Sequence, residues 1–168
     1  MSNVLSIRSR QRTRRVNVRS LRQIILHLLQ EQFAGCHYQL AVHLVTAREM
    51  ARLNERFLRH HGSTDVITFD YSDGESTHAV HGEIFISLPD SVAQARAFNT
   101  TWQSELVRYV IHGLLHLRGY DDLEPARRRV MKREENRLLN RVGTRFKLVQ
   151  LAASAPDSRK SRILNRPS

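Results

Sequence analysis

Apolar residues recur every three or four positions in several stretches of the chain, a spacing that places them on one face of a helix. The clearest run contains Leu21, Ile24, Ile25, Leu28 and Leu29. Capping residues support the boundaries, since Thr46 can cap one helix at its start and Gly119 can end another. The pattern predicts helices at about 18–33, 46–59, 89–98, 101–117 and 124–142.

Other stretches alternate between apolar and polar residues, or are rich in β-branched and aromatic residues, which is typical of strands. They cover residues 4–12, 38–45, 65–71 and 82–87. Several of these strands are connected through helices, and parallel pairing requires such connections. The pattern therefore predicts one α/β or α+β domain with a small sheet that is parallel in part.

Length and composition fit a single domain. The chain has 168 residues, of which 40% are hydrophobic, enough for one core. It contains no run of about 18 apolar residues, so we expect no membrane-spanning helix. The arginines near the N-terminus are not followed by an apolar segment, which argues against a secretory signal. The single cysteine, Cys36, cannot form an internal disulfide, and this favours a reducing, intracellular location.

The net charge of +11 is concentrated at the two ends of the chain. Residues 1–22 carry +7 and residues 145–168 carry +5, whereas residues 23–144 carry −1. Basic ends attract polyanions such as nucleic acids without reading their sequence. We assign residues 1–145 to the domain and expect residues 146–168 to form a basic, disordered tail, because residues 152–168 contain few apolar side chains.

The sharpest chemical feature is a pair of histidines, His112 and His116, in the helix predicted at 101–117. Residues four apart lie on one face of a helix, so both imidazoles can bind one metal ion. Asp122 follows after Gly119 has ended the helix, and a loop that turns back can bring its carboxylate to the same ion. Two histidines and one carboxylate leave a fourth position for water, as in catalytic zinc sites.

Two other interpretations are open at this point. The histidines can be ordinary helix residues that face solvent or pair with buried polar groups. A protease of the HExxH type is also conceivable, but its general base is the glutamate after the first histidine, and Gly113 stands there. A glycine inside a helix costs about 1 kcal/mol relative to alanine, so we expect Gly113 to serve the close approach of a neighbouring element or a substrate.

Residues 112–122 read HGLLHLRGYDD, which closely resembles HGxLHLxGYDH, the signature of the YbeY endoribonuclease family. Only the last position of the signature differs. Residues 63–69 (STDVITF) resemble the PTDVLSF segment of the family, and residues 82–86 (GEIFI) resemble its GDIxI strand. Met131 stands where the family usually has a methionine in its last helix. The resemblance covers roughly residues 4–145.

The resemblance implies an α+β fold in which helices surround a small, mostly parallel mixed sheet of about four strands, with a cleft for a single metal ion. It also implies a zinc-dependent, single-strand-specific endoribonuclease, in which metal-activated water attacks the phosphodiester. Such an enzyme acts in 16S rRNA 3′-end maturation and in late ribosome quality control. The expected partners are single-stranded rRNA and the ribosome or its small subunit, in the cytoplasm and away from membranes.

The resemblance carries two metal ligands directly onto His112 and His116. Asp122 stands where the family has its third histidine, and aspartate is also a zinc ligand. A carboxylate makes the donor set harder, so another divalent ion is possible. If Asp122 does not bind the ion, other residues can replace it: Glu124, His60, His61, His78 or His81.

The resemblance also implies a catalytic arginine in the cleft. Leu58 stands at the position of the family arginine, and Arg59 follows one residue later, so we assign Arg59 beside His112 and His116 as catalytic residues. Arg56 and Arg118 are alternatives for contacting a phosphate. Asp121 or Glu124 can orient a metal ligand by a hydrogen bond, without binding the ion itself.

Two functions from other classes compete with the endoribonuclease. One is a metal-dependent hydrolase of another substrate, such as a peptide. The other is a non-catalytic factor that binds RNA or the ribosome and holds a structural ion or none.

Overall fold

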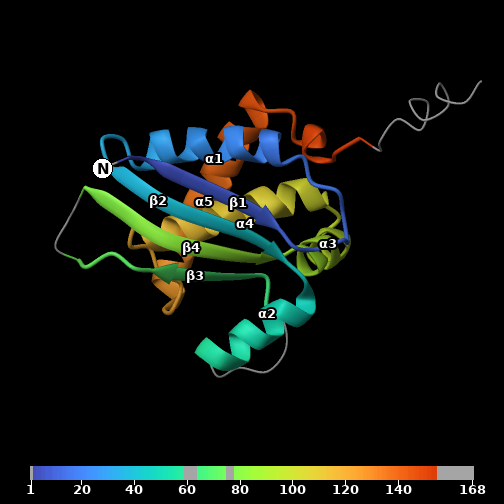
Figure 1. Ribbon diagram of the computed structural model, residues 1–168, viewed down its shortest axis with the longest axis horizontal. Coiled ribbons are helices and arrows are strands. Elements are labelled where there is room, and N and C mark those ends of the chain that lie inside the picture. Colours follow the sequence, from blue (N-terminus) through green and yellow to red (C-terminus); the bar gives the residue numbers. More distant parts are fainter. Residues whose placement is uncertain (1, 59–63, 75–77, 155–168) are drawn as a thin grey trace, which may run out of the picture.

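The fold is built on a four-stranded mixed sheet. The computed structural model describes residues 2–58, 64–74 and 78–154. The strands are β1 (Val4–Ser9), β2 (His37–Val45), β3 (Val66–Asp70) and β4 (Ala79–Ser87), arranged in the order β1-β2-β4-β3. The first three strands in this order are parallel, and β3 pairs antiparallel with β4 at the edge. This confirms the predicted α+β fold with a mostly parallel sheet of four strands (Figure 1).

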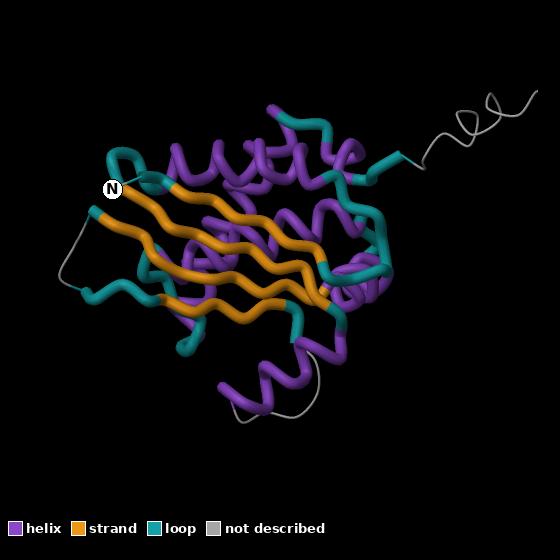
Figure 2. The backbone as a smooth tube through the Cα atoms, viewed as in Figure 1, coloured by secondary structure: helices purple, strands orange, loops and turns teal. Residues whose placement is uncertain are grey.

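Helices cover one face of the sheet along most of its length. The helices are α1 (Val18–Gln32), α2 (Ala47–Leu53), α3 (Leu88–Ala97), α4 (Trp102–Leu117) and α5 (Pro125–Arg145), and of these α2 packs on the other face. Figure 2 shows the strands in front of α4 and α5, with α2 projecting beyond the β3 edge. Because successive strand residues point to opposite faces, Leu44 and Ile84 pack in the main core with α1 and α4. Their neighbours Val45 and Phe85 face the other side and pack with Met50 of α2.

Helix α4 runs through the centre of the molecule and carries the predicted histidine pair. Thr101 caps its start, since its hydroxyl accepts a hydrogen bond from the backbone N–H of Ser104 at 3.1 Å. Gly119, with φ of +98°, follows its end in the left-handed region, as predicted. Most of the helix is apolar and buried: Leu106, Val107, Val110, Ile111, Leu114 and Leu115 are at most 2% exposed. A helix buried on nearly all sides holds its remaining polar side chains in fixed directions.

The boundary of the domain lies later than the sequence suggested. We expected residues 146–168 to form a tail, but a 3₁₀ turn, Leu148–Leu151, packs on the core and Leu151 is fully buried. The Asn17 N–H donates to the Leu151 carbonyl at 2.8 Å, and the Ala153 N–H donates to the Arg15 carbonyl at 3.0 Å. The few apolar side chains of this segment therefore suffice to dock it beside α1. Residues 155–168 lie outside the described residues.

Two other element boundaries differ in detail. The helix predicted to run to residue 59 is regular only through Leu53 and continues as a π-helical turn, Asn54–Leu58. Strand β4 begins at Ala79 and not at Gly82, because the flanking residues also pair with β2. No helix in the described ranges is both long enough and apolar enough to cross a membrane.

Gly113 marks the closest approach between α4 and the sheet. A Cβ atom at this position would lie 2.8 Å from both Cδ1 and Cγ2 of Ile84, a fully buried side chain of β4. This contact confirms the expected role of Gly113 in the close approach of a neighbouring element. It also sets the distance between the histidine pair and the strands.

This packing predicts opposite effects for two glycine-to-alanine substitutions in helices. Gly113→Ala gains about 1 kcal/mol of helix propensity, but overpacking against Ile84 costs up to about 3 kcal/mol, so we expect a net loss of about 2 kcal/mol in unfolding free energy. Gly143→Ala is the matched control, since nothing lies within 4 Å of its added Cβ. Urea denaturation should show it stabilised by up to about 1 kcal/mol. Equal stabilisation of both variants would contradict the close approach.

Candidate metal centre

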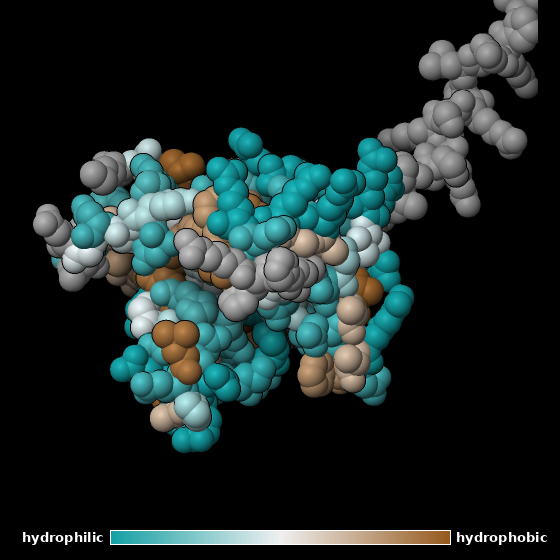
Figure 3. Space-filling view, turned by 90° about the horizontal axis from the view of Figure 1, so that it is seen from below, coloured by the Kyte–Doolittle hydropathy of each residue, from teal (hydrophilic) through white to brown (hydrophobic). Residues whose placement is uncertain are grey.

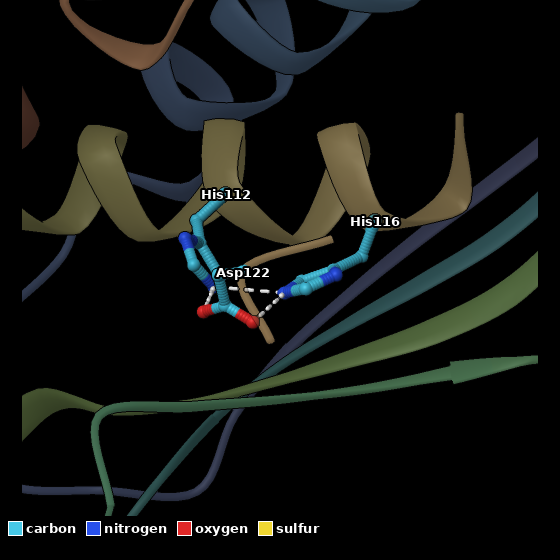
Figure 4. Close-up of side chains that lie close together, drawn as sticks. All are labelled: His112, His116 and Asp122. Atoms are coloured by element: carbon cyan, nitrogen blue, oxygen red, sulfur yellow. Dashed lines mark hydrogen bonds and ion pairs between the residues drawn. The ribbon is translucent and has the colours of Figure 1, made fainter. Parts of the chain in front are cut away.

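Three side chains from two neighbouring elements meet below α4. His112 and His116 project from one face of the helix, and Asp122 comes from the loop that connects α4 to α5 (Figure 4). The loop turns back because the Tyr120 N–H donates to the Leu115 carbonyl at 3.0 Å, and the Gly119 N–H donates to the His116 carbonyl at 2.9 Å. These bonds satisfy carbonyls at the helix end and bring Asp122 under the histidines.

The spacing of the three donor groups fits one metal ion. The Nε2 atoms of His112 and His116 are 2.9 Å apart. Asp122 Oδ2 lies 3.8 Å from Nε2 of His112, and Oδ1 lies 4.0 Å from Nε2 of His116. Two donors that each lie about 2.1 Å from a tetrahedral ion are about 3.4 Å apart, which falls among these distances. Within the described ranges, these residues form the one His/Cys/Asp/Glu group compact enough to hold a metal ion.

A buried carboxylate orients His112. Nδ1 of His112 lies 2.6 Å from Oε1 of Glu135, which projects from α5 and is only 5% exposed. An ionised carboxylate can only accept, so Nδ1 carries the proton and donates it to Glu135. Nε2 of His112 is then directed at the cluster, where it can present its lone pair to a metal ion.

A backbone carbonyl orients His116 in the same way. Nδ1 of His116 lies 3.1 Å from the carbonyl oxygen of Tyr120, which can only accept a hydrogen bond. Nδ1 therefore donates, and Nε2 of His116 also presents a lone pair. Nε2 of His112 and Nε2 of His116 therefore face each other at 2.9 Å, close enough to share a proton in a hydrogen bond or to bind one metal ion. With Asp122 beside them, they form a donor set that fits a metal ion.

The electrostatics of the cluster favour the form of His116 that can bind a metal ion. Burial lowers the pKa of His116, and the neighbouring charge of His112 lowers it further, so its ring is neutral at neutral pH. Burial alone would raise the pKa of Glu135, but the hydrogen bond from His112 and the nearby cations outweigh this and lower it. Ionised Glu135 therefore favours the folded state at neutral pH, and this contribution disappears as the pH falls through its folded-state pKa.

The cluster lies at one end of an open cleft. The cleft has a volume of about 550 Å³ and is bounded by α4, α5, the start of β3 and the α4–α5 loop. His112, Asp122 and Glu135 line it together with Tyr109 and Met131. Seen from below, the surface of the molecule is largely hydrophilic and is hollowed between two lobes (Figure 3). A polymer substrate can thus reach the cluster from solvent.

Comparison with known proteins identifies the family. The family model described as Endoribonuclease YbeY matches residues 6–143. The chain belongs to the YbeY family. The Endoribonuclease YbeY of Salinibacter ruber is 33% identical over 144 residues, which cover 82% of this chain and 91% of that protein. The Endoribonuclease YbeY of Chlorobium phaeovibrioides is 42% identical over 96 residues, which cover 57% of this chain and 63% of that protein.

A solved structure has the same fold. The solution structure of TM1509 from Thermotoga maritima superimposes with a TM-score of 0.63 at 26% identity, covering 93% of this chain and all of the other. The resemblance noted in the sequence to the YbeY family is therefore confirmed. Its members are named as endoribonucleases, which are hydrolases that cut RNA.

The structure does not bring the other residues considered for the site into the cluster where it describes them. Arg59, His60 and His61 are outside the described residues. His78 and His81 line a separate pocket with Tyr38 and Tyr71.

The acidic and basic alternatives are likewise engaged away from the cluster. Asp121 accepts a hydrogen bond from Arg127 at 2.7 Å, and Glu124 is an exposed residue at the start of α5. Arg118 donates to the buried side chain of Gln32. Arg56 lies over the ring of Phe57 at 5.2 Å. The group that orients His112 is therefore neither Asp121 nor Glu124.

Sequence reasoning missed Glu135, the residue that performs this orienting role. A signal was present, because Glu135 interrupts the buried apolar stripe of α5 formed by Met131, Leu138 and Val142. An acid at a buried helical position needs a partner, and the histidines of α4 were the available polar groups. The Tyr120 carbonyl left no such signal, since a backbone group is contributed by any residue type.

The arrangement predicts that Glu135→Ala weakens metal binding by about 10- to 100-fold, because the variant lacks the orienting partner of a metal-binding histidine. Zinc affinity can be measured by competition with a coloured chelator. Glu134→Ala is the matched control, since Glu134 pairs with Arg137 at 2.6 Å on the surface of the same helix. If Glu135→Ala bound zinc as tightly as Glu134→Ala, Glu135 would have no orienting role.

Proposed function

We propose that this protein is a zinc-dependent endoribonuclease that cleaves single-stranded RNA. The observation that carries the proposal is the cluster of His112, His116 and Asp122, in which two imidazoles direct Nε2 toward each other beside a carboxylate. Membership of the YbeY family supports the same chemistry. We further propose that the substrate is ribosomal RNA near the 3′ end of 16S rRNA, bound on the ribosome or its small subunit in the cytoplasm.

The donor set suits zinc. His112, His116 and Asp122 would hold the ion with two nitrogen donors and one oxygen donor, and zinc accepts both at similar distances. A zinc ion held in this way supplies Lewis acidity, which acidifies water and polarises a phosphoryl oxygen. Asp122 adds a negative charge that a third histidine would not, so water bound to such an ion would be less acidic than in a site of three imidazoles.

The residues of the chain supply position and protonation state. Glu135 and the Tyr120 carbonyl hold the protons on Nδ1 of the two histidines, and thereby keep both Nε2 atoms available as donors. Within the described ranges, Asp122 is the one acidic residue grouped with both histidines, so no separate general base stands out there. We retain Arg59 as a proposed contact for the scissile phosphate, next in sequence to the turn that ends at Leu58.

The shape and charge of the molecule favour single-stranded RNA. A flexible strand can enter a cleft of about 550 Å³, whereas paired bases are held in the duplex. The net charge of +11 adds attraction to any polyanion. A peptide substrate is disfavoured because Gly113 stands where HExxH proteases have their base.

The proposal predicts that metal content and RNA cleavage fall together when the cluster is changed. In His116→Ala and Asp122→Ala, we expect zinc affinity and cleavage of a labelled single-stranded RNA to fall by more than about 10-fold. In Asp122→His, a ligand is retained, and cleavage should stay within about 10-fold of the wild type. His37→Ala, which changes an exposed histidine outside the cluster, is the control.

Three outcomes would contradict parts of this proposal. Wild-type protein that binds zinc without cleaving RNA, and whose stability alone responds to chelation, would favour the non-catalytic RNA-binding factor. Unchanged zinc affinity in Asp122→Ala would remove Asp122 from the ligand set. A large gain of activity in Asp122→His would show that the aspartate impairs this site.

A further inference from the structure

Helix α5 is strongly basic. Its 21 residues include eight Arg or Lys and two Glu, a net charge of +6. Residues 23–144 as a whole carry −1. The basic residues of α5 are therefore a local concentration of charge, which the overall balance of the body conceals.

Carboxylates neutralise only part of the positive charge of this helix. Arg127 pairs with Asp121 at 2.7 Å, and Arg141 pairs with Glu31 at 2.9 Å. Arg129 and Arg133 make no hydrogen bond or ion pair within the described ranges, and Arg128 donates only to the backbone carbonyl of Asp122, at 3.1 Å. Guanidinium groups that lack a carboxylate partner remain available to an external anion.

The charges on one side of α5 line the cleft of the metal cluster. Arg128, Arg129 and Lys132 line the same cleft as His112 and Asp122, and Arg108 of α4 joins them. Lys132 and Arg108 lie 3.6 and 3.7 Å from Glu135, but they share this one carboxylate, which also accepts the hydrogen bond of His112. We call Arg108, Arg128, Arg129 and Lys132 the cationic wall.

The remainder of the cleft lining differs in character. Val66 and Met131 are apolar, and Asp65 at the start of β3 is acidic. A polyanion in the cleft is therefore attracted toward α5 and repelled from the start of β3. The cationic wall also places like charges on neighbouring turns, since Arg128 and Lys132 are four residues apart and Arg129 and Lys132 are three apart. Such pairs destabilise a helix until an anion binds between them.

We propose that the cationic wall binds the backbone phosphates that flank the scissile bond, so that the RNA strand runs along α5. The proposal rests on the proposed function and adds the direction of the substrate and the residues that hold it. Arginine binds phosphate oxygens through two parallel N–H groups, and such contacts fix the strand without selecting bases. The cationic wall is thus a positioning surface, separate from the ligands of the ion.

A charge-matched pair of variants tests the proposal. Arg129 and Arg133 are both exposed, lie one helical turn apart and have no partner within the described ranges, but only Arg129 lines the cleft. Arg129→Glu and Arg133→Glu change the net charge equally, so long-range attraction to RNA changes equally. Zinc content and melting temperature, measured for both variants, confirm that the site and the fold are intact.

For zinc-loaded protein and a labelled single-stranded RNA, Arg129→Glu should raise KM by about 10-fold or more, with kcat within about 2-fold of the wild type. The dependence of log(kcat/KM) on log salt should become less steep by about 0.7 for each phosphate that the variant no longer neutralises. Arg133→Glu should change KM by less than about 3-fold. Equal effects of the two variants would overturn the proposal, because α5 would then act only through its overall charge.

Equilibrium binding separates this proposal from the proposed function. Fluorescence anisotropy with the same RNA in the presence of a chelator reports binding without cleavage. If wild-type protein fails to cleave RNA but Arg129→Glu alone loses affinity, the cationic wall is supported and the nuclease activity is not. If wild-type protein cleaves RNA and both variants bind it equally, the nuclease activity is supported and the cationic wall is not.

Discussion

The structure depends on the directions of two imidazole nitrogens, the Nε2 atoms of His112 and His116, which face each other at 2.9 Å. Their directions are imposed by acceptors on the far side of each ring, the Glu135 carboxylate for His112 and the Tyr120 carbonyl for His116. The rings cannot turn these nitrogens away without breaking these bonds inside a partly buried site. Two nitrogens held in this way would bind one metal cation, and Asp122 adds a negative charge beside them.

The fold explains why these directions are held. Helix α4 is enclosed by the sheet and by α5, and Gly113 lets it approach Ile84 closely enough to fix its height above β4. Glu135 reaches His112 only because α5 packs along α4, and Tyr120 reaches His116 only because Gly119 turns the chain back. Charges of both signs are sorted within one cleft. Acidic groups gather at the histidines, where a cation is to be held, and basic groups gather along α5, where a phosphate chain would lie.

Local spacing was enough to predict the cluster and most of the fold. His112, His116, Gly119 and Asp122 all lie within 11 residues of the chain. Their spacing alone therefore predicts that Asp122 comes close to the two histidines. Glu135 could not be placed as easily, because it lies 23 residues after His112 on another helix. Their contact depends on how α4 and α5 pack. The docked turn at Leu148–Leu151 was missed for a related reason. Its apolar residues are too few to form a core of their own, but they pack onto the core formed by α1 and α4.

The most direct test of this account is a zinc titration of the protein followed by long-range ¹H–¹⁵N NMR correlation of the histidine rings. The account predicts that, with one equivalent of zinc, His112 and His116 both carry their proton on Nδ1, and that both Nε2 signals shift together to values typical of metal-bound imidazole. Zinc that leaves the two Nε2 signals unchanged, or either ring protonated on Nε2 in its presence, would contradict it.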